Sequence, residues 1–229
     1  MRLVLCLMIS LISNIAMGQL IEVPVARVTR PSILWDTSVY RDVLNHGWFQ
    51  PMPNPDDKIN MVHESTHDLN AELSIKIGNP KVYIYYCLNG KAYKVKRPIV
   101  SLLDIMKELP YVGNASFYLV QRPYDAYYIG DELSAYINGC QCGLEIGAIV
   151  KTEFSFQHAC QLCQYCILIN KHAKQTDLKE YIDHQIAVLK VIRTKLPLKT
   201  GTRDYDTMIN MQEHFDDTHT TGSIVQEVK

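Results

Sequence analysis

Residues 61–70 read Met-Val-His-Glu-Ser-Thr-His-Asp-Leu-Asn, and the prediction of the fold starts from this stretch. Apolar residues recur here at the three- and four-residue spacing of one helix face: Met61, Val62, Leu69, Leu73 and Ile77. Asp56 and Asp57 come before the stretch and suit a helix N-terminus, and Gly78-Asn79-Pro80 follows it and ends the pattern. The sequence therefore predicts a helix from about Asp57 to Gly78.

His63 and His67 are four residues apart on this predicted helix, so their side chains point from the same face. Two imidazoles in this arrangement suit one zinc ion. Glu64 lies beside the first histidine, where its carboxylate can act as general base on a water that zinc activates. The alternative is a solvated helix face that matches a short pattern by accident. The apolar flanks and an acceptable third ligand favour the metal site.

A catalytic zinc site normally takes three protein ligands and leaves one position open. Position 70 is Asn and position 73 is Leu, so no third histidine follows on the same helix. The best distant candidate is Glu132, at the start of another predicted helix. Asp131 is the rival ligand, or the acceptor of a hydrogen bond from a ligand histidine. Alternatively, both acids only favour the positive end of that helix.

With these two blocks, residues 61–73 and 127–139, the sequence resembles the zincin metallopeptidases and specifically the gluzincins, in which a Glu on a later helix completes HExxH. More narrowly, it resembles a group of poorly characterised, exported bacterial proteins that are putative metallopeptidases. The resemblance implies a zinc-dependent hydrolase of peptide bonds. It implies the following site residues: His63, His67 and Glu132 as ligands of Zn²⁺ and Glu64 as general base.

Gluzincins commonly carry a Tyr or His that stabilises the oxyanion, and Tyr124, Tyr127 and Tyr128 precede Glu132 closely enough to take this role. Tyr128 is the residue that we select. The resemblance also implies that a hairpin over residues 81–96 supplies a strand at the edge of the cleft, against which a peptide is laid.

The other elements predict an α+β, zincin-like fold with a small β-hairpin or sheet and a mainly helical C-terminal half. Residues 19–57 are rich in Pro, Asn and Trp, which favours extended segments and turns. Asn89-Gly90 is the preferred pair of a type I′ turn and predicts the hairpin. We expect, in chain order, a short helix capped by Ser101, a strand over Phe117–Gln121, and helices over about 131–149, 154–173 and 176–196.

The ends of the chain are interpreted separately from this domain, which we place at residues 19–198. Residues 1–18 have a positive start at Arg2, an apolar run and small residues at the end, which is typical of a signal peptide. We therefore expect a secreted or periplasmic protein, or a membrane-anchored one if the signal is not cleaved. Residues 199–229 are polar and predict a flexible tail. Residues 19–60 either cover the cleft as a propeptide or pack as ordinary structure.

Cysteines remain in an even number after residues 1–18, namely Cys87, Cys140, Cys142, Cys160, Cys163 and Cys166. An even count in an oxidising compartment favours disulfides, although six cysteines allow about fifteen pairings. A structural metal or iron–sulfur site is the alternative.

The composition excludes some classes of function and leaves others open. Hydrophobic residues make up 47% of the 229 residues, as in an ordinary globular protein, and the formal net charge of -1 gives no electrostatic basis for binding nucleic acid. We expect a peptide or protein substrate and no membrane span after signal cleavage. The alternatives are a non-catalytic secreted binding domain, stabilised by zinc or disulfides, and a hydrolase of another amide.

Overall fold

The computed structural model describes residues 19–26, 37–47, 57–109, 116–197 and 202–224. Within them the chain is mostly helical, with one small antiparallel sheet, so the predicted α+β class is confirmed. The elements are β1 Gln19–Glu22, α2 Ser38–His46, α3 Lys58–Ile77, β2 Val82–Tyr86, β3 Lys91–Lys96, α4 Leu102–Glu108, α5 Ser116–Gln121, α6 Ala126–Glu145, α7 Ile149–Ala173, α8 Thr176–Lys195 and α9 Thr202–Ile224.

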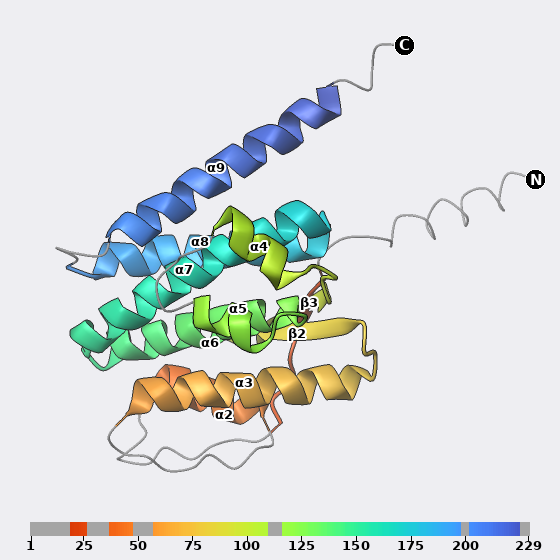
Figure 1. The fold of residues 1–229 in the computed structure, drawn as a ribbon. Coiled ribbons are helices and arrows are strands. Elements are labelled where there is room, and N and C mark those ends of the chain that lie inside the picture. Colours follow the sequence, from red (N-terminus) through yellow and green to blue (C-terminus); the bar gives the residue numbers. More distant parts are fainter. Residues whose placement is uncertain (1–18, 27–36, 48–56, 110–115, 198–201, 225–229) are drawn as a thin grey trace, which may run out of the picture.

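The sheet lies between two groups of helices (Figure 1). Its strand order is β1-β3-β2, and β3 pairs antiparallel with both neighbours. The side chains of β2 alternate between the two faces. Tyr83 and Tyr85 pack into the larger core with α6, α7 and α8, whereas Ile84 and Tyr86 pack into the smaller core with α2 and α3. Both faces of the sheet are therefore covered, which explains why every residue of β2 is buried.

Helix α3 has the bounds that the sequence predicts. The Asp57 side chain accepts a hydrogen bond from the Asn60 backbone N–H at 3.1 Å, which caps the N-terminus, and the helix ends at Gly78. The predicted turn of the hairpin is also confirmed. Asn89 and Gly90 both have positive φ, 53° and 67°, and the Lys91 N–H donates to the Leu88 carbonyl at 3.0 Å.

The hairpin does not present a free strand edge to a peptide, contrary to the expectation from the resemblance. Strand β3 is central, and the outer N–H groups of β2 donate to side chains of α3. Ile84 N–H donates to Ser74 Oγ at 2.9 Å, and Tyr86 N–H donates to Asn70 Oδ1 at 2.7 Å. Helix α3 therefore occupies the position that an added strand would need.

Two elements differ in type from the prediction. Residues 38–46 form helix α2 within a region predicted as extended, because Thr37 Oγ1 caps it through the Tyr40 N–H at 3.2 Å and Val43 and Leu44 are buried. Residues 116–121 form helix α5 rather than a strand. Phe117 and Val120 are about 60% exposed and only Leu119 is fully buried, which is the one-sided pattern of a short surface helix.

The tail also differs from the prediction, because residues 202–224 form helix α9. Met208 is fully buried and Phe215 is 9% exposed in the larger core. Gln161 Nε2 and Gln164 Nε2 of α7 donate to the side chain and the carbonyl of Asp204, both at 2.9 Å. Tyr205, Ile209 and Met211 also pack against this core. Apolar contacts and hydrogen bonds thus dock this largely polar helix, which the composition of the segment did not indicate.

Two of the long helices begin earlier than predicted, whereas α8 Thr176–Lys195 has the predicted bounds. Helix α6 begins at Ala126 rather than at about residue 131, and α7 begins at Ile149 rather than at about residue 154. The two helices pack closely at Gly143, where an added Cβ would lie 2.1 Å from Thr152 Oγ1. Any larger side chain at this position would push α6 and α7 apart.

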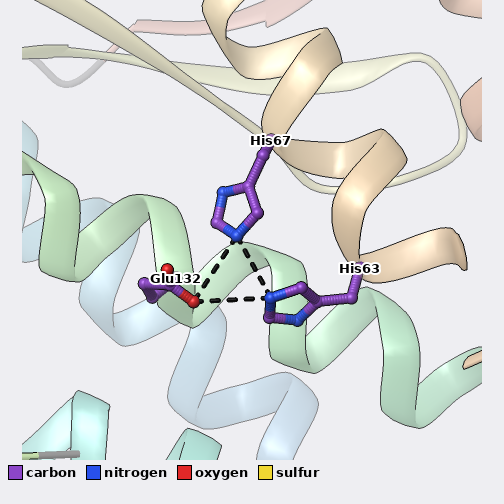
Figure 2. A group of neighbouring side chains, drawn as sticks. All are labelled: His63, His67 and Glu132. Carbon is purple, nitrogen blue, oxygen red and sulfur yellow. Dashed lines mark hydrogen bonds and ion pairs between the residues drawn. The ribbon is translucent and has the colours of Figure 1, made fainter. Parts of the chain in front are cut away.

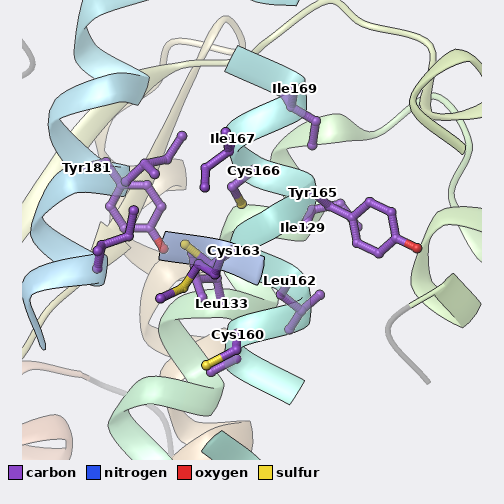
Figure 3. Packing of buried hydrophobic residues seen from close by; sticks show 14 of the residues in the cluster. Ile129, Leu133, Cys160, Leu162, Cys163, Tyr165, Cys166, Ile167, Ile169 and Tyr181 are labelled. Carbon is purple, nitrogen blue, oxygen red and sulfur yellow. The ribbon is translucent and has the colours of Figure 1, made fainter. Parts of the chain in front are cut away.

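The predicted disulfides are absent from the structure, in which all six described cysteines are free thiols. Five are fully buried among apolar side chains, and Figure 3 shows Cys160, Cys163 and Cys166 of α7 inside the larger core. Burial raises the pKa of these thiols well above the usual range. The cysteines pack as small apolar residues, which spacing alone does not distinguish from a disulfide framework. The only group of metal-binding side chains found among the described residues contains no cysteine.

The predicted signal peptide, residues 1–18, lies outside the described residues. Among the helices that the structure describes, none is both long enough and apolar enough to cross a membrane.

Candidate metal centre

His63 and His67 lie on one face of α3, as the sequence predicts, and α6 brings Glu132 to the same point (Figure 2). The two Nε2 atoms are 3.1 Å apart, and Glu132 Oε2 lies 3.4 Å from each of them. Among the described residues this is the one cluster of His, Cys, Asp or Glu side chains that could hold a metal ion. Glu132 is far from the two histidines in the sequence and meets them where α3 packs against α6.

The carboxylate of Glu132 is buried, with 3% of its side chain exposed. Its Oε2 atom receives no well-aligned hydrogen bond in the described part of the chain. Burial alone would raise the pKa of Glu132, but the contacts with His63 and His67 outweigh it and lower the pKa to about 2. A buried, ionised oxygen with two imidazoles beside it and no donor aligned to it suits a cation.

Asp131 orients His67 from outside the cluster. The Nδ1–H of His67 donates to Asp131 Oδ2 at 2.7 Å, which leaves Nε2 facing Glu132 and His63. Burial lowers the pKa of His67, but the hydrogen bond with Asp131 and the charge of the nearby Glu132 carboxylate outweigh it and raise the pKa to about 10. Of the two roles considered for Asp131, the structure gives it that of hydrogen-bond acceptor from a histidine of the cluster. This contact resembles the carboxylate–histidine pairs that support metal ligands.

Asn70 holds Asp131 in turn, and the sequence analysis did not identify it. Its Nδ2 donates to Asp131 Oδ1 at 2.7 Å and lies 2.8 Å from Ser134 Oγ. Its Oδ1 accepts the N–H of Tyr86 at 2.7 Å. The signal was present in the sequence: Asn70 follows His63 and His67 by seven and three residues, so it lies on the same helix face.

Glu64 is exposed beside the cluster and borders two cavities. One cavity, of about 680 Å³, lies on the side of His67, and the other, of about 580 Å³, lies on the side of His63. Both have the volume of an ordinary ligand pocket. Asp68 is also exposed and lines the first cavity. Glu64 therefore borders the space on both sides of the cluster, and a ligand bound in either cavity would lie beside its carboxylate.

The three candidate tyrosines lie in different places. Tyr128 lines the larger cavity, and its ring is 6.3 Å from that of His67. Burial and the nearby Glu132 carboxylate raise the pKa of Tyr128 above its usual range, so its phenol stays protonated at neutral pH. Tyr127 packs on Tyr83, with ring centroids 4.8 Å apart, and Tyr124 is 79% exposed and away from both cavities.

Two further tyrosines border the cluster, and the sequence analysis did not identify them. Tyr136 packs edge-on against His63 with ring centroids 4.5 Å apart, and its hydroxyl lies 2.9 Å from that of Tyr118. Both line the smaller cavity. Tyr136 follows Glu132 by one helical turn, which was a usable signal, whereas Tyr118 was assigned to a strand.

Comparisons with family models, curated proteins and solved structures find no match to this chain.

Proposed function

We propose that the protein is a secreted zinc-dependent metallopeptidase with a gluzincin-like centre of His63, His67 and Glu132. The observation that carries the proposal is the triangle of 3.1, 3.4 and 3.4 Å between their three facing atoms. Zinc bonds of about 2.0–2.2 Å in a tetrahedron place ligand atoms about 3.3–3.6 Å apart. The observed spacing is close to that geometry without rearrangement of the backbone.

The surroundings of the triangle support the same group. Glu132 Oε2 has no aligned donor, and zinc would be its partner. Asp131 fixes which nitrogen of His67 is free, as the supports of metal-binding histidines do. Three protein ligands would leave a fourth position for water or substrate. Glu64 borders both cavities beside the two histidines, so its carboxylate is available as a base there.

When bound, zinc would polarise a substrate carbonyl and lower the pKa of a water molecule. Glu64 would accept the proton of this water and pass it to the leaving amine, so that one carboxylate acts first as base and then as acid. The protonated phenol of Tyr128 would donate a hydrogen bond to the oxygen on which negative charge develops. Tyr118 and Tyr136 would border the substrate on the other side of Glu64.

A peptide is the preferred substrate because the two cavities extend from Glu64 in both directions, as an extended chain needs. Because α3 covers the outer edge of β2, the substrate would be held by the side chains of these cavities and not by pairing with the hairpin. Secretion remains part of the proposal only because residues 1–18 have the pattern of a signal peptide. Disulfides would have supported it, but the described cysteines are free thiols. Sequencing the N-terminus of the protein recovered from its source tests it.

The first test is the metal content of the purified protein and of His63→Ala and Glu132→Ala, by elemental mass spectrometry. We expect about one zinc per chain in the parent and loss in both variants. Zinc lost in His63→Ala but kept in Glu132→Ala would move the third ligand elsewhere. No zinc in the parent, even after reconstitution, would end the enzyme proposal and favour a non-catalytic binding domain.

The second test is a peptide-library digest with Glu64→Gln as the control. This substitution keeps the shape of the side chain and removes the base. We expect zinc content to stay the same and cleavage to fall by at least about 10²-fold. If Glu64→Gln still cleaved the peptides at the parent rate, the cleavage would come from a contaminant or from another site. Intact peptides, with cleavage of another amide, would change the substrate class but not the centre.

A further inference from the structure

Two arginines line the larger cavity together with His67, and the proposed chemistry uses neither of them. Arg97 follows β3, and its backbone N–H donates to the Lys81 carbonyl at 2.8 Å. Arg122 lies between α5 and α6, and its carbonyl accepts the N–H of Asp125 at 3.0 Å. These hydrogen bonds hold the backbone of each arginine in place, so the two side chains extend from defined positions in the lining of the cavity.

Both guanidinium groups lie over aromatic rings. The Cζ atom of Arg122 is 4.1 Å from the centre of the Tyr128 ring, and that of Arg97 is 4.1 Å from the centre of the Tyr127 ring. Tyr83 contributes a second ring to Arg97, at 5.5 Å. An arginine that lies over an aromatic ring keeps its charge, and the N–H groups in the plane of the guanidinium remain available to donate hydrogen bonds. The rings therefore orient the two cations without using their hydrogen-bonding edges.

Within the part of the chain that the structure describes, neither guanidinium is neutralised by a neighbouring carboxylate. Among the described residues, no carboxylate forms an ion pair with Arg97 or Arg122, and the Nε of Arg97 is buried without a hydrogen-bond partner. Lysines elsewhere on the surface do pair, as Lys76 does with Glu72 at 2.6 Å and Lys171 with Glu108 at 2.8 Å. Both guanidinium groups are therefore available to pair with a negatively charged ligand.

The other charges of the cavity suit a singly charged ligand. Glu64 and Asp68 are exposed carboxylates of α3, on a different wall from the arginines, and Asp131 is engaged by His67 and Asn70. The two exposed carboxylates would repel a doubly charged phosphate more strongly than a singly charged carboxylate. A planar carboxylate also matches the fork of a guanidinium.

The arginines lie close to the candidate metal centre. The ring that Arg122 covers is itself 6.3 Å from the ring of His67. An extended peptide advances about 3.4 Å per residue, so a group held by Arg122 is within about three residues of the bond near His67.

We propose that the larger cavity is a subsite for a carboxylate of the substrate, bound by Arg97 and Arg122. The proposal rests on the metallopeptidase function and gives its substrate class: peptides with a negative group within about three residues of the cleaved bond. The carboxylate is either the free C-terminus of the peptide or an acidic side chain. The first source would make the enzyme a carboxypeptidase, and the second an endopeptidase with acidic specificity.

The test measures binding to the full chain carrying Glu64→Gln, with and without added zinc, by isothermal titration calorimetry at fixed ionic strength. The probes are an N-acetylated alanine-rich pentapeptide with a free C-terminus, its C-terminal amide, and amides with one Glu at successive positions. We expect a carboxylate to strengthen binding about 10-fold or more over the plain amide. Preference for the free acid identifies the C-terminus as the source, and preference for a Glu amide identifies the side chain.

Arg97→Gln and Arg122→Gln, each added to Glu64→Gln, should remove most of this preference while binding the plain amide as before. Lys190→Gln is the matched control, because it removes one positive charge from the exposed face of α8, outside both cavities. Thermal unfolding checks each variant, and Arg122 is exposed, so its replacement leaves the core intact. Arg122→Lys should restore part of the preference, since it returns the charge but not the fork.

Equal binding of acid and amide, no binding of any probe, or an unchanged preference in both arginine variants would overturn the proposal. These outcomes differ from a failure of the metallopeptidase function. That failure would appear as absent zinc or cleavage independent of Glu64, while an arginine-dependent preference for carboxylates in the zinc-free protein would still stand.

Discussion

Asn70→Ala tests whether the sheet edge and the candidate metal centre are supported by one side chain. Asn70 is fully buried, and its amide connects Asp131 of α6 with the backbone of β2. Replacement by Ala removes the donor to the Asp131 carboxylate and the acceptor of the Tyr86 N–H, both at 2.7 Å. A single change thus loosens the support of His67 and exposes one edge of the sheet.

The cost follows from these two contacts. A hydrogen bond to a charged group contributes about 1.5–3 kcal/mol, and a buried N–H left without an acceptor costs about 1–3 kcal/mol. The two contacts share one side chain, so we expect the free energy of unfolding to fall by about 3–5 kcal/mol. We also expect zinc affinity to fall by about 10-fold, the lower end of the range for residues outside the ligand shell, because Asp131 itself remains.

Urea unfolding of the zinc-free protein measures the first quantity, and competition with a chelator measures the second. Asn138→Ala is the matched control. Asn138 is also a buried asparagine, and its Nδ2 donates to the Tyr86 backbone carbonyl at 3.2 Å, but among the described residues it forms no hydrogen bond with Asp131 or His67. This control should lose about 1–2 kcal/mol of stability and keep its zinc affinity. Equal loss of zinc affinity in both variants, or a loss of stability below about 1 kcal/mol in Asn70→Ala, would refute the reasoning.

Three further outcomes are expected from the packing of the helices. In native protein at pH 8 the five fully buried thiols should not react with a charged disulfide reagent within minutes, whereas in guanidinium these five and Cys87 should all react. A disulfide among these six cysteines, detected by mass after rapid quenching, would contradict the structure. Burial raises the pKa of Cys142 to about 11, so ionisation of this thiol favours the unfolded state. The free energy of unfolding should therefore fall as the pH rises above about 8.5, the pKa of an exposed thiol. Cys142→Ser should weaken this pH dependence. Gly143→Ala should lower the free energy of unfolding by about 1–3 kcal/mol, measured by thermal unfolding, despite the better helix propensity of Ala. Adding Thr152→Ala should recover part of this loss. If Gly143→Ala were as stable as the parent, α6 and α7 would be free to move apart.

The sequence predicted the parts of the molecule whose pattern is local. Helix α3 has its capping residue, its apolar face and its terminating Gly78 within twenty-odd residues, and the hairpin has its Asn89-Gly90 turn. The pairing of the two histidines follows from helical spacing alone. Glu132 does lie beside them, although its position depended on a helix that begins five residues earlier than predicted.

The rest depended on contacts between distant segments, which a local pattern does not encode. Helix α9 is polar over most of its length, and its docking depends on Met208, Phe215 and the hydrogen bonds of Asp204. Helix α5 has a strand-like composition but a single buried residue. The spacing of the cysteines is typical of a disulfide framework, but their side chains are buried among apolar residues of the core. The support of His67 by Asp131 was considered among other roles, and only the packing of α3 on α6 selects it.

The hydrogen bonds that join α3 to the outer edge of β2 also bear on the order of folding. Ser74 and Ile84 are ten residues apart and Asn70 and Tyr86 sixteen, so helix and strand can associate by closing a short loop. Asp131 and His67 are 64 residues apart, and this contact requires α6 to dock. We therefore expect the two histidines to be in place before Glu132 arrives, with high φ-values at Ser74 and low ones at Ser134. A metal ion bound first by the histidine pair would then favour the docking of α6, so that zinc should speed the last step of folding rather than only stabilise its product.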